Sequence, residues 1–195
     1  METTFYGIEF LTRPGRVFTP RATTEALVDA ALAHIDDAPK KIADVGTGAG
    51  VIGVSIALAA PQVEVFATDI NPEAVELARE NANRHGVADR VHVFEGDLLG
   101  PVPAAVDLVV ANLPYLPEDD PQPEYEDEPP DAVYSAGDGL GPLERLVDIC
   151  EAGKLAMPGF VLVQYRGEVL EQDCQHLPEL RERLSARAAV PAPVD

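Results

Sequence analysis

The chain has 195 residues, 46% of them hydrophobic, so it can bury one continuous core and is not a disordered acidic tail. Thirty-four acidic residues against fourteen basic ones give a formal net charge of −20, which disfavours direct binding to the phosphates of nucleic acids. No apolar run approaches the roughly 20 residues that span a bilayer, and residues 1–4 lack the features of a secretory signal, so we expect a cytoplasmic protein that does not bind membranes.

The first segment, residues 1–40, is expected to pack on the main domain as an N-terminal extension. Within it, residues 5–18 are similar to a short hairpin with Gly15 in its bend. Thr23 or Thr24 could cap the helix that follows, because a threonine oxygen can accept a hydrogen bond from the first turn of a helix.

From residue 41 onward, short apolar runs alternate with amphipathic stretches. The apolar runs predict strands at residues 41–45, 63–68, 90–94, 106–111 and 159–165. The amphipathic stretches predict helices at residues 51–60, from Asn71-Pro72 to His85-Gly86, and at 143–156. This order indicates an α/β domain over residues 41–175, with a mostly parallel sheet and helices on both faces. A C-terminal helix and a Pro-Ala-Pro tail are expected at residues 176–195.

A glycine-rich turn follows the first strand of this domain and consists of Gly46, Thr47, Gly48, Ala49 and Gly50. Glycine lets the backbone approach a ligand closely, and the N-terminus of the next helix offers unpaired N–H groups. Residues 48–53 also match the G-x-G-x-x-G fingerprint of dinucleotide-binding proteins. Asp44 at the strand end favours a different nucleotide, because a carboxylate can receive a ligand's ammonium group. A purely structural turn remains an alternative.

Two further aspartates follow strands of the same sheet. Asp69, with Ile70 after it, ends the second strand about 20 residues beyond the glycines, where a carboxylate can accept hydrogen bonds from ribose hydroxyls. Asp97, followed by Leu98, comes after the third strand and could accept from an adenine amino group. Each aspartate alone could be a helix cap or a loop turn, but three acidic strand ends together favour a nucleotide site.

Asn112, Leu113, Pro114 and Tyr115 follow the fourth strand. The carboxamide oxygen of Asn112 and the backbone carbonyl of Leu113 can both accept from one NH2 group. A planar amide or aromatic amine held in this way has its two hydrogens fixed and its lone pair directed at a methyl donor. Pro114 restricts the loop, and Tyr115 offers a ring for stacking. The motif favours an N-methyltransferase.

Together these motifs resemble the HemK/PrmC family of class I (Rossmann-like) methyltransferases, which methylate the side-chain amide nitrogen of glutamine in translation termination factors. The resemblance covers about residues 5–165 and includes residues 18–21, 24–25, 128–129 and 137–140. It implies a release factor substrate with a GGQ loop, S-adenosyl-L-methionine as the cofactor, and catalysis by residues 112–115. The residues implied at the cofactor are Asp44, Gly46, Thr47, Gly48, Ala49, Gly50, Asp69, Ile70, Asp97, Leu98 and Asn112.

The chain departs from the family pattern at three points. Leu113 replaces the first proline of N-P-P-Y, and N-L-P-Y also resembles rRNA dimethyladenosine transferases. This sequence is not expected to include the helical N-terminal domain of the bacterial enzymes. Short relatives without that domain look dependent on a small zinc-binding activator protein, so the resemblance implies such a partner as an option. No final pair of strands is identified in residues 176–195.

Four alternative functions remain open. They are an RNA or DNA base-amine methyltransferase, a small-molecule methyltransferase, an NAD-dependent dehydrogenase and a non-catalytic nucleotide-binding module.

The segment 116–131 and Arg21 each allow two interpretations of their role. Residues 116–131 hold eight carboxylates and five prolines, so they predict neither a helix nor a central strand. This acidic loop is either a solvated connection or a lid that contacts a basic partner. Arg21 could pair with a carboxylate or help to close the cofactor pocket. The dispersed histidines predict no metal site.

Overall fold

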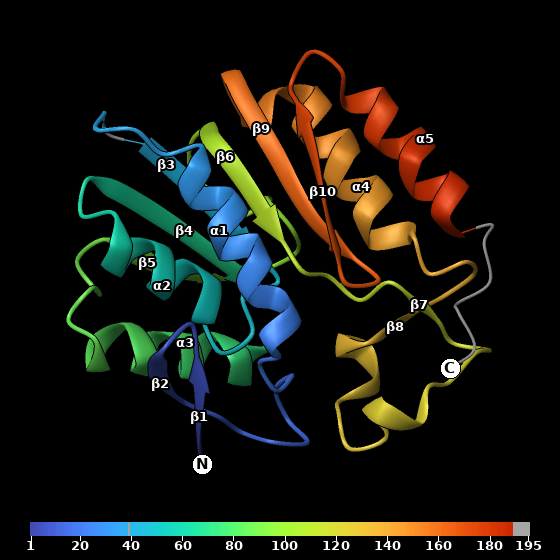
Figure 1. Cartoon of the computed structure of the whole chain (residues 1–195), viewed down its shortest axis with the longest axis horizontal. Helices are drawn as coiled ribbons and strands as arrows, with labels where there is room; N and C mark the ends of the chain where they lie inside the picture. The colour runs from blue at the N-terminus through green and yellow to red at the C-terminus, as the bar shows by residue number, and fades with distance from the viewer. Residues whose placement is uncertain (39, 189–195) are drawn as a thin grey trace.

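The computed structural model describes residues 1–38 and 40–188, and its main element is a six-stranded sheet (Figure 1). The strands follow the order β10-β9-β6-β3-β4-β5 along the sheet. Their bounds are Lys40–Val45 (β3), Val63–Asp69 (β4), Val91–Glu95 (β5), Val106–Ala111 (β6), Leu155–Tyr165 (β9) and Glu168–Asp173 (β10). Neighbouring strands are parallel except that β10 runs antiparallel to β9. The predicted mostly parallel sheet is therefore confirmed.

Helices cover both faces of this sheet, as predicted. They are α1 (Glu25–Ala33), α2 (Val51–Ala59), α3 (Pro72–Arg84), α4 (Gly141–Ile149) and α5 (Leu177–Ala188). Successive strand residues point to opposite faces. Ile42 of β3 thus packs in a core with α1, α2 and α3, whereas Ala43 packs in a second core with α4 and α5. Figure 1 shows α4 and α5 side by side beyond β9.

The N-terminal hairpin lies earlier in the chain than the sequence predicted. It consists of β1 (Glu2–Phe5) and β2 (Ile8–Leu11), joined by Tyr6 and Gly7. Both turn residues have positive φ, 52° and 72°. A two-residue hairpin turn can require such angles, but a tyrosine rarely adopts them, so this pair gives a weak sequence signal. Gly15 lies in a separate turn after β2.

The chain after α4 differs from the prediction at two points. The helix continues as a wider turn, Cys150–Lys154, and ends where Gly153 adopts a φ of 101°, so β9 begins at Leu155. Arg166 and Gly167, both at positive φ, then turn the chain into β10. No strand was predicted after residue 165, and β10 corrects this expectation. The Pro-Ala-Pro tail lies outside the described residues.

The acidic loop lies outside the main sheet, with β7 (Leu116–Pro117) paired to β8 (Tyr134–Ser135). This confirms that residues 116–131 provide no central strand. Two short 3₁₀ turns, Pro123–Tyr125 and Pro130–Ala132, begin at prolines, which the first turn of a helix tolerates because its N–H groups need no partner. The prediction of no helix is wrong for these two turns.

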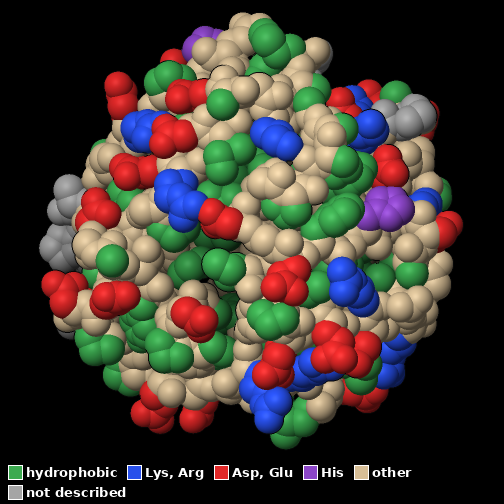
Figure 2. Space-filling view, turned by 180° about the vertical axis from the view of Figure 1, so that it is seen from behind, with side chains coloured by type: hydrophobic (Ala, Val, Ile, Leu, Met, Phe, Trp, Pro, Cys, Tyr) green, Lys and Arg blue, Asp and Glu red, His purple; other side chains and the backbone are tan. Residues whose placement is uncertain are grey.

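Acidic side chains are spread widely over the surface. Figure 2 shows one face, on which apolar side chains gather around a hollowed area and acidic ones surround it. The described residues on this face form no continuous basic surface of the kind that follows a nucleic acid backbone. Across residues 1–38 and 40–188, each helix is too short or too polar to cross a membrane.

Candidate active site

A cavity of about 290 Å³ opens at the carboxyl ends of β3, β4 and β6. β3 and β6 are neighbours in the sheet although β4 and β5 separate them in the sequence. The strand order therefore reverses here, and such a point is where open α/β sheets bind ligands. Most predicted site residues line the cavity: Gly46, Thr47, Gly48, Ala49, Asp69, Ile70, Asp97, Leu98, Asn112, Leu113, Pro114 and Tyr115. Asp44 and Gly50 are not among the lining residues.

The glycine-rich turn forms one wall of the cavity. Gly46 and Gly48 have positive φ, 71° and 55°, which glycine adopts readily and other residues do not. A Cβ at Gly46 would lie 2.7 Å from Leu113 Cδ2, so the turn presses against the loop after β6. A Cβ at Gly48 would have one neighbour, Val17, at 3.9 Å. The backbone at Gly48 is therefore open to a ligand.

Asp44 and Gly50 lie on the side of the glycine-rich turn that faces away from the cavity. Asp44 is fully buried, and its Oδ2 accepts hydrogen bonds from Thr47 Oγ1 (2.6 Å) and Gly53 N (2.9 Å). Gly50 immediately precedes α2 and lies against α3, where an added Cβ would be 3.0 Å from Ala78 Cβ. The expectation that Asp44 meets a ligand's ammonium group is therefore corrected. Its carboxylate orders the turn, because the Asp44 side chain points away from the cavity into the core and is bonded to Thr47 and Gly53.

This burial makes the stability of the protein depend on pH. Burial raises the pKa of Asp44 from its usual 3.8 to about 6. Because the folded pKa lies above the unfolded one, the stabilising contribution is present below about pH 4 and is lost as the pH rises to about 6. A shift of about two pKa units corresponds to at most ~3 kcal/mol.

Asp44→Asn is expected to be increasingly stable relative to wild type as the pH rises from 4 to 7. Asparagine keeps an oxygen that can accept from Thr47 and Gly53, but it cannot ionise. Calorimetric unfolding of both proteins without ligand across this range measures the difference. A difference in Tm that does not change with pH would contradict the assignment of this dependence to Asp44.

Asp69 ends β4 beside the glycine-rich turn. Its Oδ2 accepts a hydrogen bond from Gly48 N (2.8 Å) and its Oδ1 accepts one from Asn71 N (2.9 Å). Carboxylate oxygens have capacity for further hydrogen bonds, for example from ligand hydroxyls. The next residue, Ile70, is 71% exposed and lines the cavity. The end of β4 therefore offers a polar group and an apolar surface side by side.

Asp97 and Leu98 lie in the turn after β5. Gly96 N donates to Asp69 O (2.9 Å) and so ties this turn to the end of β4. Asp97 forms an ion pair with Arg145 of α4, so the carboxylate expected at an adenine amino group also has a cationic partner. Leu98 is buried with a φ of 48°. A non-glycine residue at such an angle is strained, and such strain clusters at ligand sites.

The loop after β6 begins with Asn112, whose Nδ2 donates to Thr24 Oγ1 (3.1 Å). Thr24 precedes α1 at the N-cap position, but its side chain makes no capping bond. The bond to Thr24 orients the carboxamide, because it commits the nitrogen branch and leaves the oxygen branch as an acceptor. Leu113 is buried against Gly46. The two residues expected to grip an NH2 group therefore lie beside the glycine-rich turn.

Pro114 and Tyr115 continue this wall of the cavity. The ring of Tyr115 lies 5.1 Å from that of Tyr165, measured between centroids. Burial raises the pKa of Tyr115 to about 12, so its phenol stays neutral near pH 7. Gly139 allows the chain to pass close by, because a side chain there would collide with the carbonyl oxygen of Tyr115. The site thus holds one aromatic ring, that of Tyr115, which packs on the buried Tyr165.

Residues that precede α1 bind the acidic loop at the cavity through hydrogen bonds, an ion pair and a cation–π contact. Arg21 donates to Glu124 O (2.9 Å) and lies over the ring of Tyr125, 4.3 Å from its centroid. Glu128 accepts from Thr19 N (2.9 Å) and faces Arg21 at 3.6 Å. Arg21 and Tyr125 line the cavity, so this part of the loop forms one of its walls, whereas residues 118–121 are exposed to solvent. Arg21 thus pairs with a carboxylate and also lines the cavity.

Two residues of the cavity have roles that the sequence did not predict. Thr24 orients Asn112, which lies 88 positions further along the chain. Gln164 of β9 is buried, and its Nε2 donates to Thr23 O (3.1 Å), 141 positions away. Within the described part of the chain, Gln164 Oε1 has no hydrogen-bond partner. Pairs so far apart in sequence leave no local pattern.

The chain is similar to several known proteins. Residues 8–124 match the family model described as the methyltransferase small domain. A release factor glutamine methyltransferase of Deinococcus radiodurans is 39% identical over 178 residues, which cover 89% of this chain and 60% of the relative. One of Xylella fastidiosa (strain 9a5c) is 42% identical over 156 residues, covering 76% and 54%. The chain thus spans less than two thirds of the length of these relatives.

A solved structure has a similar fold. An RNA methyltransferase from Salinibacter ruber, in complex with S-adenosyl-L-homocysteine, matches with a TM-score of 0.52 and 24% sequence identity. The match covers 75% of this chain and 76% of that one. At this identity the likeness concerns the fold. The architecture, including the sheet that carries the cavity, is that of a class I methyltransferase.

Proposed function

Because the chain belongs to the family of small-domain methyltransferases, we propose that it transfers a methyl group from S-adenosyl-L-methionine to a glutamine side-chain nitrogen of a peptide chain release factor. Relatives named release factor glutamine methyltransferase support this acceptor. The observation that carries the proposal is the position of Asn112, whose carboxamide is oriented by Thr24 beside the glycine-rich turn.

The residues of the cavity fit the proposed cofactor. Gly48 leaves its backbone open to a ligand, and the Asp69 carboxylate beside it can accept from ribose hydroxyls. Asp97 can accept from an adenine amino group, and Ile70 and Leu98 offer apolar contacts to a flat ring. When bound, the cofactor supplies an electrophilic methyl group.

The remaining task of the chain is to hold the acceptor nitrogen. Asn112 Oδ1 and Leu113 O can each accept one hydrogen of an NH2 group, which fixes the plane of the amide and directs the nitrogen lone pair to one side. Two oxygens at this place also stabilise positive charge that develops on the nitrogen. Neither oxygen is a useful base near neutral pH, so the displaced proton passes to solvent. The ring of Tyr115, which lines the cavity and is supported from the core by the buried Tyr165, provides a surface for stacking the acceptor.

The distribution of charge supports a protein acceptor. Proteins that bind ribosomal RNA tend to be basic, and the acidic loop over the cavity would attract such a partner while repelling a free nucleic acid. A cytoplasmic location accords with this substrate. The need for a small zinc-binding activator stays a prediction.

Radiolabelled methyl transfer tests the proposal. The purified protein is incubated with labelled S-adenosyl-L-methionine and either a release factor, the same factor with the glutamine of its GGQ loop replaced by alanine, or ribosomal RNA. We expect label in the unmodified factor and in neither of the other two. Label in the RNA, or in the alanine-substituted factor, would overturn the proposed acceptor.

A further inference from the structure

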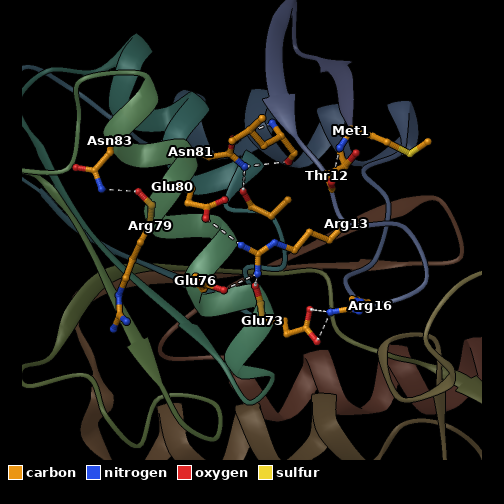
Figure 3. A network of polar contacts seen from close by, with 12 residues as sticks. Met1, Thr12, Arg13, Arg16, Glu73, Glu76, Arg79, Glu80, Asn81 and Asn83 are labelled. Carbon is orange, nitrogen blue, oxygen red and sulfur yellow. Dashed lines mark hydrogen bonds and ion pairs between the residues drawn. The ribbon is translucent and has the colours of Figure 1, made fainter.

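Asn81 lies on α3 and is fully buried, although it does not line the cavity (Figure 3). Its Oδ1 accepts a hydrogen bond from Leu11 N (2.9 Å). Its Nδ2 donates to Leu11 O (3.1 Å) and to Ala49 O (2.8 Å). Both hydrogens of the amide are therefore used. One side chain joins the end of the N-terminal hairpin to the glycine-rich turn.

The two partners of Asn81 lead to two segments that both line the cavity. Ala49 belongs to the glycine-rich turn proposed to hold the cofactor. Leu11 ends β2 and leads into residues 12–24, which we call the strap. The strap contributes Phe18, Arg21 and Thr24 to the cavity. The Asn81 carboxamide thus fixes the place where the strap starts relative to the turn.

Other contacts between the hairpin region and α3 are more exposed. Arg13 pairs with Glu76 (2.6 Å) and with Glu80 (2.9 Å), whose side chains are 66% and 45% exposed (Figure 3). Exposed ion pairs contribute little, because water screens them. A buried amide is different, since its loss leaves backbone groups without partners and without water. Asn81 is therefore expected to make the strongest of these polar contacts.

We infer that Asn81 is a positioning residue that holds the glycine-rich turn and the strap in the relative arrangement needed to bind both the cofactor and the acceptor. This inference rests on the proposed function, because it assigns cofactor binding to the turn and acceptor binding to the strap side. The role acts through Ala49 and Leu11, and Asn81 itself touches neither ligand.

The test compares Asn81→Asp with Asn83→Asp. Both changes add one negative charge to α3, but Asn83 is exposed and its Nδ2 donates within the helix, to Arg79 O (2.8 Å). Aspartate at position 81 keeps an acceptor for Leu11 N and places an oxygen against the carbonyls of Leu11 and Ala49. We expect Asn81→Asp to raise the Kd for S-adenosyl-L-methionine and the acceptor KM at least about tenfold each, and Asn83→Asp to change neither by more than about twofold.

Calorimetry at a temperature well below the unfolding midpoint of each variant measures the cofactor Kd, and steady-state kinetics give the KM. A purely structural role would lower the Tm of Asn81→Asp and leave its Kd at the wild-type value, and that result would overturn the inference. If Asn81→Asp does not fold, Asn81→Leu and Asn83→Leu are compared in the same way. Failure of wild type to bind the cofactor would instead refute the proposed function.

Discussion

Replacing Asn112 with alanine is expected to lower kcat about 10²–10³-fold while the Kd for S-adenosyl-L-methionine stays within about threefold of wild type. The reason is the separation of tasks at the cavity. Asn112 Oδ1 is proposed to orient the acceptor amide, whereas the turn and Asp69 hold the cofactor. Alanine removes the oxygen and leaves the turn in place. Single-turnover kinetics and calorimetry measure the two quantities.

Two variants control this prediction. Asn83→Ala removes an exposed asparagine side chain and should leave both quantities unchanged. Thr24→Val removes the hydroxyl that accepts from Asn112 Nδ2 and should lower kcat less than Asn112→Ala does, because the carboxamide remains but is no longer held in one orientation. If Asn112→Ala weakened cofactor binding as much as it slowed turnover, the separate roles would be wrong.

Replacing Asp69 with alanine should act on the cofactor first. The change removes the proposed partner of the ribose hydroxyls and leaves Gly48 N and Asn71 N without their acceptor. Unpaired buried groups cost roughly 1–3 kcal/mol, which corresponds to a Kd increase of about 5–150-fold. Calorimetric titration with S-adenosyl-L-methionine measures this increase.

The control for Asp69→Ala is Asp89→Ala, which removes an exposed carboxylate in the loop before β5 and should not alter the Kd. Saturating cofactor should restore most of the turnover of Asp69→Ala, because the acceptor site is intact. A large loss of kcat that persists at saturation would show that Asp69 acts on the acceptor or on the chemistry.

The strand ends could be located from the sequence because their signals are local. Asn71 and Pro72 start α3 as predicted, and the Asn71 side chain accepts from Glu73 N (2.9 Å). Parallel strands then bring the residues after β3, β4 and β6 to one edge of the sheet, which places most of the predicted site residues around one cavity.

What the sequence did not predict depends on contacts between distant residues. Asp44 and Asp69 are both aspartates near a strand end, but β3 continues through Val45 whereas β4 ends at Asp69. Asp44 is therefore fully buried, and the sequence pattern does not reveal this difference. The bond from Asn81 to Ala49 spans 32 positions, and that from Arg21 to Glu124 spans 103. The β10 strand follows a turn at Arg166, a residue type that does not usually mark a turn at positive φ.

The most direct test is a crystal structure of the protein with S-adenosyl-L-homocysteine and a glutamine-containing release factor peptide. We expect Asn112 Oδ1 and Leu113 O each to lie about 2.7–3.2 Å from the side-chain nitrogen of that glutamine. We expect the sulfur of the cofactor product to lie on the side of the nitrogen that bears the lone pair. A complex in which residues 112–115 turn away from the cofactor product, so that the glutamine cannot fit between them, would contradict it.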